Sequence, residues 1–370
     1  IGQLSTFRQL KSAAAGHPEY GLAAGIETTT GPLGQGIANA VGMAVAEQMM
    51  AARYGIELVD HRTYVIAGDG CLMEGISHET ASLAGHLKLS RLTLLFDDNG
   101  ISIDGPTNLT VSDNQGARFE ALGWHVQHIN GHDPEEAAKA IKTANADPRP
   151  SMIACKTTIG YGAPTKQGTA ATHGAPLGPD EVAAARLALK WPHPPFKIPA
   201  RILEGWRQIG RRSSQTRRDW QARLRTSTQR TDFEDAIAGL LPNDWSHALD
   251  SFKETQIASG EAVATRKASE SVLEIINQEI PNTVGGSADL TGSNNTKTKN
   301  MVAVSANNFG GNYIYYGVRE HAMAGAMNGI ALHGGLVPYG GTFLVFSDYA
   351  RPAMRLSAIM GLRVIYVMTH

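Results

Sequence analysis

Two short glycine-flanked segments carry the residues best suited to bind a metal ion. Gly68-Asp69-Gly70 follows one apolar run, and Asp98-Asn99-Gly100 follows the next, about thirty residues later. Because neighbouring parallel strands end at the same edge of a sheet, Asp69 and Asn99 should lie side by side. Mg²⁺ prefers oxygen ligands and often keeps phosphates and water, so these oxygens and the backbone carbonyl of Ile101 predict a metal-held diphosphate. Two purely structural strand-end turns are the alternative.

A glycine-rich loop offers a second contact for an anion. Residues 31–36 read GPLGQG and precede a run of small residues, 37–50, that predicts a helix. Glycine lets the backbone approach a ligand closely, and the free N–H groups of a helix start favour negative charge. Tight helix packing explains the same composition equally well, so this loop alone does not decide the site.

The composition limits the class of protein. The chain has 370 residues, 42% of them apolar and 18% charged, with a net charge of -1. These values predict a soluble globular protein of two or more domains. The sequence has no cluster of basic residues of the kind that binds nucleic acid, so we expect no nucleic-acid partner. No apolar run reaches the ~20 residues of a membrane span. The two cysteines, Cys71 and Cys155, favour a reduced compartment, so we expect a cytoplasmic protein.

Alternating strand-like and helical segments predict an α/β fold. The pattern occupies 63–157 and begins again near residue 266, whereas residues 191–198 are rich in proline and precede a charged helical stretch, 200–230. Such alternation indicates mainly parallel sheets with helices on both faces. We therefore expect two such domains, 1–190 and 263–370, joined by a helical linker, 191–262.

The motifs together resemble the transketolase family. TTTGPLGQGIANAVGMAVAE, GDGCLMEGISHE, FDDNGISIDG, THGAPLG, GGSADLTGSN and YGVREHAM occur in the family's order, and the resemblance extends from Phe7 to His370. It implies a diphosphate-binding (PP) domain followed by a pyrimidine-binding (Pyr) domain, which bind thiamine diphosphate and Mg²⁺, with Ca²⁺ or Mn²⁺ as alternatives. It also implies a homodimer with sites between the PP domain of one subunit and the Pyr domain of the other.

The resemblance assigns cofactor-binding roles to individual residues. Asp69, Asn99 and the backbone of Ile101 match the metal ligands. The matching cofactor contacts are Gly31, Pro32 and Leu33 along thiamine, Gly70 and Glu74 in the GDG motif, Asn99, His173, Glu320 at the aminopyrimidine ring, and Phe343, Phe346 and Tyr349 around it. Asp289 in GSADL is expected in the cofactor cleft or at the subunit contact, with a strand-end cap as the alternative.

The implied reaction is reversible transfer of a two-carbon ketol group. The donor would be a ketose phosphate such as xylulose 5-phosphate, and the acceptor an aldose phosphate such as ribose 5-phosphate or erythrose 4-phosphate. Glu320 would keep a proton for the aminopyrimidine because an apolar setting raises the pKa of a carboxyl group. The catalytic residues implied are Glu320, His173 and His17, and the substrate-binding residues are His17, His173, Arg266, Ser293 and His370.

Other histidines and other activities remain open. His61, His86, His128, His193 and His247 are expected to be structural because no HExxH or CxxC spacing suggests a metal site among them. Dihydroxyacetone synthase, phosphoketolase and deoxyxylulose-phosphate synthase share the cofactor. The family is longer at both ends and the first residue is Ile1, so we expect a chain truncated at both ends. An inactive cofactor-binding or dimerising fragment is therefore a further alternative.

Overall fold

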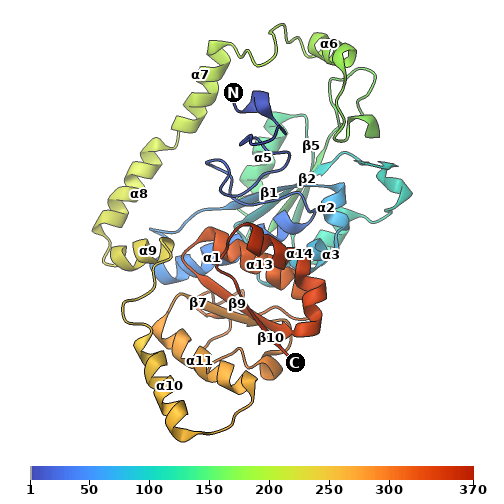
Figure 1. The fold of residues 1–370 in the computed structure, drawn as a ribbon. Helices are drawn as coiled ribbons and strands as arrows, with labels where there is room; N and C mark the ends of the chain where they lie inside the picture. The colour runs from blue at the N-terminus through green and yellow to red at the C-terminus, as the bar shows by residue number, and fades with distance from the viewer. Residues whose placement is uncertain (1) are drawn as a thin grey trace.

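The first half of the chain forms a parallel sheet with helices on both faces. The computed structural model describes residues 2–370 (Figure 1). The strand order is β1 (Thr63–Gly68), β2 (Leu92–Asp98), β6 (Ser151–Lys156) and β5 (His125–Asn130), and every pairing is parallel. The connecting helices are α2 (Asp69–Met73), α3 (Gly75–His86), α4 (Gln115–Ala121) and α5 (Pro134–Ala144). A small antiparallel pair, β3 (Ile101–Ser102) and β4 (Gly105–Pro106), and the turn η2 (Thr107–Leu109) follow β2.

The second half repeats this architecture. Its strand order is β10 (Ile365–Thr369), β9 (Val337–Phe343), β7 (Thr283–Ser287) and β8 (Tyr313–Tyr315), again with parallel pairings. Its helices are α11 (Thr265–Glu279), α12 (Thr291–Asn294), α13 (Glu320–His333) and α14 (Ser347–Ile359). The strand expected over 337–346 ends at Phe343, because Leu344–Phe346 turns into the 3₁₀ segment η4. The predicted fold class, two mainly parallel α/β units, is confirmed.

Helices joined by loops connect the two halves along one side of the molecule (Figure 1). They are α6 (Pro179–Ala188), α7 (Ala200–Arg211), α8 (Ser214–Thr226), α9 (Arg230–Ile237) and α10 (His247–Ser259), while the 3₁₀ turns η1 (Leu4–Thr6) and η3 (Ala170–Thr172) lie earlier in the chain. The indole N–H of Trp220 on α8 donates to the Leu58 carbonyl at 2.8 Å. This hydrogen bond holds α8 against the first half of the chain. Among residues 2–370, none of the helices combines the length and the apolar character that crossing a membrane requires.

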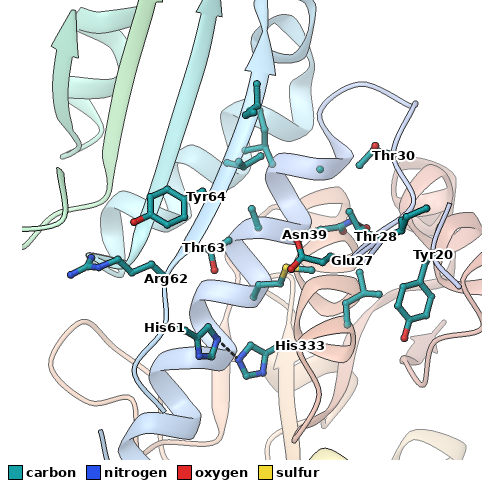
Figure 2. A pocket seen from close by; sticks show the side chains of 18 of the residues that line it. Tyr20, Glu27, Thr28, Thr30, Asn39, His61, Arg62, Thr63, Tyr64 and His333 are labelled. Carbon is teal, nitrogen blue, oxygen red and sulfur yellow. Dashed lines mark hydrogen bonds between the residues drawn. The ribbon is translucent and has the colours of Figure 1, made fainter. Parts of the chain in front are cut away.

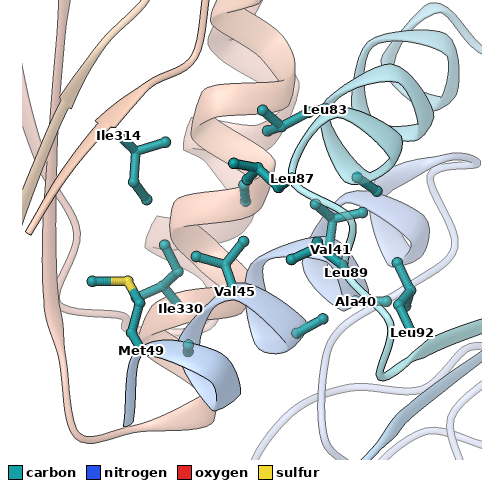
Figure 3. Close-up of a cluster of buried hydrophobic side chains, with 14 of the residues drawn as sticks. Ala40, Val41, Val45, Met49, Leu83, Leu87, Leu89, Leu92, Ile314 and Ile330 are labelled. Atoms are coloured by element: carbon teal, nitrogen blue, oxygen red, sulfur yellow. The ribbon is translucent and has the colours of Figure 1, made fainter. Parts of the chain in front are cut away.

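Two helices in contact, α1 (Gln35–Tyr54) and α13, form the seam between the halves (Figure 1). A Cβ atom at Gly329 would overlap the Asn39 carbonyl, and one at Gly42 would overlap the Ala326 carbonyl. Only glycine therefore permits the backbones of these helices to approach so closely. Buried side chains from α1, α3 and the second half, including Val45 and Ile330, fill the space around them (Figure 3). The two halves consequently share one continuous hydrophobic core.

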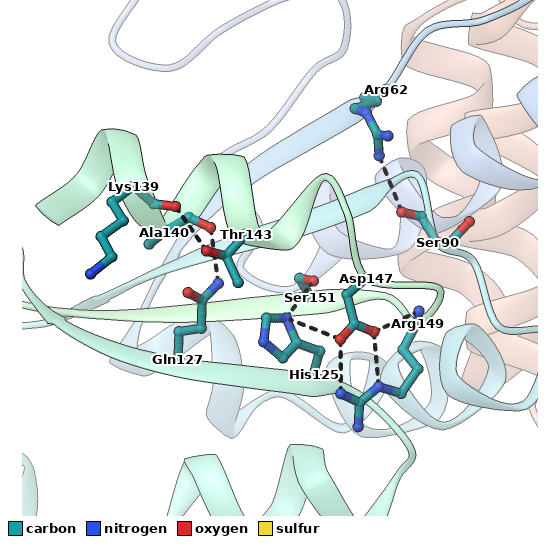
Figure 4. A network of polar contacts seen from close by, with 10 residues as sticks. All are labelled: Arg62, Ser90, His125, Gln127, Lys139, Ala140, Thr143, Asp147, Arg149 and Ser151. Atoms are coloured by element: carbon teal, nitrogen blue, oxygen red, sulfur yellow. Dashed lines mark hydrogen bonds and ion pairs between the residues drawn. The ribbon is translucent and has the colours of Figure 1, made fainter. Parts of the chain in front are cut away.

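A polar network fixes the opposite end of the first sheet (Figure 4). His125 opens β5 and Ser151 opens β6, and the His125 Nδ1 atom lies 3.1 Å from the Ser151 hydroxyl. The neighbouring Asp147 carboxylate accepts two hydrogen bonds from the Arg149 guanidinium, each 2.9 Å long. Because this network lies at the amino ends of the strands, it anchors the sheet away from the edge where ligands bind in such folds.

Candidate functional site

The predicted metal-binding residues meet at the carboxyl ends of β1 and β2. The Gly100 N–H donates to Asp69 Oδ2 at 3.2 Å, and the Ile101 N–H donates to Asn99 Oδ1 at 3.0 Å. Asp69 begins the short helix α2 directly after the extended Gly68. A carboxylate is favoured there, because the first turn of a helix carries partial positive charge.

Negative charge is concentrated around Asp69. Burial raises the pKa of the Asp69 carboxyl, and the charges of Asp98 and Asp97 raise it further. Asp97 accepts hydrogen bonds from the Asn99 amide at 3.0 Å and from the Thr157 hydroxyl. A divalent cation would compensate this desolvated charge, so the donor set fits Mg²⁺. Within residues 2–370 no three His, Cys, Asp or Glu side chains are grouped as a metal site, which suits an ion that also uses amide, backbone and phosphate oxygens.

The glycine-rich loop packs directly on this motif. A Cβ atom at Gly70 would lie 3.1 Å from the Leu33 Cδ1 atom, and one at Gly34 would lie 2.9 Å from the Glu74 Cβ atom. Gly31 has a φ of 140°, and a Cβ atom there would lie 3.0 Å from the His17 ring. The loop, the GDG motif and His17 are thus drawn together by the positive φ values and the missing side chains of these glycines.

A cavity of about 1360 Å³ lies beside this loop (Figure 2). It extends from His17 and the glycine-rich loop, past Tyr64 and Ile66 of β1, to His61 and His333. The described residues that line it do not include Asp69 or Asn99. The cavity is therefore a neighbour of the metal-binding turn and not the same site, and we place the chemistry at the turn because the oxygen ligands converge there.

The predicted acid of the second half, Glu320, begins helix α13. It is buried, with 7% of its surface exposed. Next to it, the Ala322 N–H donates to Glu79 Oε2 at 2.9 Å, and the Tyr349 hydroxyl donates to the other Glu79 oxygen. Burial raises the pKa of Glu79, and the nearby Glu320 charge adds to this shift. Two carboxyl groups therefore share one partly desolvated site.

Glu79 was missed by the sequence analysis. It lies on α3, five positions after Glu74 in the EGISHE segment, so the family motif contained it without indicating its partner. The signal that could have found it is a second carboxyl group on a helix of otherwise small and apolar residues. Its contact with Tyr349, more than two hundred residues later, depends on the packing of the two halves.

Aromatic and cationic residues gather at the carboxyl edge of the second sheet. The rings of Phe343 and Phe346 stack with centroids 6.0 Å apart, and Phe343 lies 4.8 Å from the His370 ring. The Arg266 guanidinium lies 3.5 Å from His370 Nε2. Four predicted residues are thus brought together, whereas Tyr349 points to Glu79. The adjoining Leu344 and Val345 are 61% and 65% exposed, so this edge presents apolar surface.

The remaining predicted residues lie on turns. Ser293 belongs to α12, whose Asn294 amide donates to the Thr369 hydroxyl at 2.5 Å, and this contact holds the helix against the end of β10. Asp289 follows β7 as an exposed residue with a φ of 60°, a geometry that suits a strand-end turn. The structure does not decide between the turn and the cofactor role for Asp289.

His173 lies on an exposed loop that is braced from its base. The N–H and hydroxyl of Thr165 donate to Glu181 at 2.8 and 2.6 Å, and the Lys166 ammonium donates to the Leu177 carbonyl at 2.7 Å. The Thr165 hydroxyl lowers the pKa of Glu181, which keeps this carboxylate charged. Within residues 2–370, the His173 side chain makes no hydrogen bond, so the structure does not join it to the other predicted groups.

Comparison with known proteins agrees with both halves of the chain. Residues 1–241 match the family described as transketolase, thiamine diphosphate binding domain, and residues 261–370 match transketolase, pyrimidine binding domain. The transketolase of Cereibacter sphaeroides is 60% identical over all of this chain and 56% of its own length. The solved transketolase of Leishmania mexicana has a TM-score of 0.93 and 41% identity, again over 100% and 56% of the two chains.

A further solved structure includes a sugar phosphate in its name. It is a mutant transketolase from Pichia stipitis in complex with xylulose-5-phosphate, with a TM-score of 0.94, 40% identity and coverage of 100% of this chain and 56% of that one. Fold and matches together define a thiamine diphosphate-binding protein. The chain belongs to the transketolase family, and it spans about half the length of the curated relatives it matches.

Proposed function

We propose that this chain carries the cofactor-binding halves of a transketolase that moves a two-carbon ketol group from a ketose phosphate to an aldose phosphate. Xylulose 5-phosphate as donor, and ribose 5-phosphate or erythrose 4-phosphate as acceptors, are the substrates we favour. The observation that carries the proposal is the convergence of Asp69, Asn99 and Ile101 at one turn of a chain that also has a buried Glu320. The sugar phosphate named for the Pichia stipitis relative supports the substrate class.

In this proposal each half holds one end of the cofactor. Asp69, Asn99 and the Ile101 carbonyl would hold Mg²⁺ and, through it, the diphosphate of thiamine diphosphate, while the loop 31–34 would lie along the thiamine. The bound cofactor supplies a nucleophilic carbon and an electron sink for the donor's ketol carbons. Glu320, which is buried at the start of α13, would hydrogen-bond the aminopyrimidine ring of the cofactor.

The second half would also supply the groups that recognise the sugar. Arg266 and His370, which already lie 3.5 Å apart, would bind the phosphate, because a guanidinium and an imidazole both donate to phosphate oxygens. Ser293 would add a hydroxyl donor. His17 and His173 would contact the sugar hydroxyl and carbonyl groups and move protons near neutral pH. Phe343 and Phe346 would pack around the pyrimidine ring.

The exposed apolar edge of the second half supports a homodimer. The exposed Leu344 and Val345 lie between Phe343 and Phe346 in the chain, and a large exposed apolar patch usually marks an interface. We propose that the first half of one subunit and the second half of its partner enclose each cofactor, which would also exclude water from the reaction. We further propose that residues 1–190 and 263–370 are the PP and Pyr domains, with 191–262 as linker, and that the protein acts in the cytoplasm.

The decisive experiment replaces Glu320 by Gln. We expect Mg²⁺-dependent binding of thiamine diphosphate, measured calorimetrically, to stay within about threefold of the original value. Exchange of the thiazolium C2 proton, followed by NMR in D₂O, should fall by about 10² or more, the usual effect of removing a group that transfers a proton. Glu254→Gln, on the exposed side of α10, is the matched control and should change neither value. Normal exchange in Glu320→Gln would contradict the assigned role.

Two other functions are separated by their products. Dihydroxyacetone synthase activity would require formaldehyde as acceptor, and phosphoketolase activity would release an acyl phosphate from the same donor. Incubating the protein with xylulose 5-phosphate and each acceptor in turn, followed by product analysis, discriminates between them. Cofactor binding with no turnover of any pair would favour the inactive fragment.

A further inference from the structure

An imidazole pair joins the two halves at the far end of the seam. His61 precedes β1, and His333 is the last residue of α13. Their Nε2 atoms are 2.9 Å apart, and their rings stack with centroids 4.9 Å apart at 21° (Figure 2). Both residues line the cavity, so solvent reaches the pair. Because 272 positions separate them, no local spacing in the sequence could reveal this pair.

The hydrogen bonds of His333 fix the direction of its lone pair. Its Nδ1 atom lies 2.9 Å from the Gly334 carbonyl, which can only accept, so Nδ1 carries the proton and Nε2 is the acceptor when the ring is neutral. His61 Nε2–H then donates to it. A histidine that donates its second ring nitrogen to a carbonyl and directs the other outward has the arrangement seen in metal-binding histidines.

The spacing of the two nitrogens suits neighbouring ligands of one ion. For a metal–nitrogen bond of about 2.0–2.1 Å, ligands at a right angle are about 2.9 Å apart and tetrahedral ligands about 3.3 Å apart. The observed 2.9 Å separation therefore matches neighbouring positions of a square-planar or octahedral ion, and small ring rotations would reach the tetrahedral value. Imidazole pairs bind Ni²⁺, Cu²⁺ and Zn²⁺ in preference to hard ions such as Mg²⁺.

We propose that His61 and His333 form a binding site for a first-row transition-metal ion, which links the start of β1 in the first half to the end of α13 in the second. Water from the cavity would complete the coordination. On binding, His61 moves its ring proton from Nε2 to Nδ1 through solvent, so two neutral imidazoles coordinate the ion without net proton release. This site is separate from the magnesium turn and does not depend on the proposed function.

The charged neighbours of the pair are compatible with a bound cation. Asp60, beside His61, is paired with Arg91, and Arg91 also lies 3.4 Å from the buried Glu47 carboxylate. Arg62 points away, donating to the Ser90 and Asn145 carbonyls. Above pH 7, two carboxylates thus offset two guanidinium groups around the site, whereas below pH 7 Glu47 keeps its proton because burial raises its pKa to about 7. Neither carboxylate is counted as a ligand.

The test uses Ni²⁺ as the probe, with Mg²⁺ in large excess so that the Asp69 turn is occupied. Calorimetric titration should show one Ni²⁺ equivalent per chain, with a higher melting temperature in its presence because the ion binds only the folded protein. His61→Gln should bind this equivalent at least tenfold more weakly, whereas His86→Gln, an exposed histidine of α3, should match the unmodified protein. Equal binding by His61→Gln and the unmodified protein would overturn the proposal.

A measurement on the unmodified protein makes the test independent of any variant's folding. One equivalent of Cu²⁺ should give an electron paramagnetic resonance spectrum with coupling to two imidazole nitrogens. Coupling to a different number of nitrogens, or none, would also overturn the proposal.

Discussion

The two candidate half-sites of this chain differ in how much of their environment the chain itself provides. At the end of the first sheet, Asp69 and Asn99 are held by backbone N–H groups of neighbouring residues, and burial already shifts the pKa of the carboxyl. At the end of the second sheet, Phe346 is 39% exposed and its neighbours Leu344 and Val345 are exposed further. The first half-site is complete in its supporting contacts, whereas the second presents apolar surface to solvent.

The difference indicates which properties each half should have alone. A preorganised oxygen site needs only its ion, so substitutions there should alter ligand affinity with little change in assembly. An exposed apolar edge is stabilised when a second subunit covers it. Substitutions there should therefore weaken association of the subunits before they affect cofactor binding. The following predictions test this division, from the largest expected effect to the smallest.

Asp69→Asn should have the largest effect. It removes the charged oxygen ligand while preserving shape, so Mg²⁺-dependent affinity for thiamine diphosphate should fall by more than about 100-fold, beyond the usual effect of removing a supporting residue. Calorimetric titration with and without Mg²⁺ measures this loss. Asp104→Asn, in the exposed loop between β3 and β4, is the control. Unchanged affinity in Asp69→Asn would show that the turn is not the metal site.

Glu47→Gln should stabilise the protein at alkaline pH. Burial raises the pKa of Glu47 from 4.5 to about 7, despite the opposing Arg91 charge. As pH rises from 4.5 to 7 the unfolded chain loses this proton while the folded chain keeps it, so folding is disfavoured by up to about 3 kcal/mol above pH 7.

The amide cannot titrate, so the variant should exceed the original protein in unfolding free energy at pH 8 and approach it near pH 4.5. Urea unfolding at both pH values measures the difference. Equal stabilities at pH 8 would show that the buried carboxyl group is adequately solvated or paired.

Leu344→Asp should weaken self-association at least tenfold without a large change in cofactor binding to the first half. A charge placed in an apolar interface loses its hydration, whereas at an exposed position it has little effect. Sedimentation velocity over a range of concentrations measures the shift. Leu187→Asp on α6, where the leucine is 81% exposed, is the matched control. The same sedimentation for both variants and the original protein would place the interface elsewhere.

Glu181→Gln should have the smallest effect, limited to the loop that carries His173. The amide retains one acceptor but loses the charge that Thr165 stabilises, so the loop should open about three- to tenfold more often, equivalent to about 1 kcal/mol for one hydrogen bond. Hydrogen exchange over residues 159–178 measures this opening. Glu234→Gln, whose partner is the Arg230 guanidinium on the distant helix α9, is the control. Unchanged exchange would mean that the Lys166 contact alone holds the loop.

The sequence predicted features that depend on local patterns. The structure and the comparisons confirmed the parallel sheets, the α/β class and the family. These features could be predicted because they depend on hydrophobic periodicity and on the order of short motifs, both of which can be read from the sequence. The approach of Asp69 to Asn99 followed from strand order alone. The start of α2 at Asp69 was not predicted, since a pair of glycines around an aspartate does not distinguish a turn from a helix start.

Features that depend on packing between the halves were not predicted. Neither the contact of Glu79 with Tyr349 nor that of His61 with His333 follows from spacing, because both arise where α1 and α13 bring distant segments together. The roles assigned to all the predicted site residues stay predictions, since a side chain acquires a role only when a ligand reaches it.

The glycine contacts between α1 and α13 restrict how this protein can vary over evolutionary time. Positions 42 and 329 admit no side chain unless the facing helix moves, and α13 begins at Glu320 while α1 follows directly on the loop assigned to the cofactor. A shift of either helix at this contact would therefore move Glu320, at the start of α13, or the loop 31–34, which lies just before α1. Variation should accumulate on outer helices such as α7, while the central pair changes only by coordinated replacement on both sides.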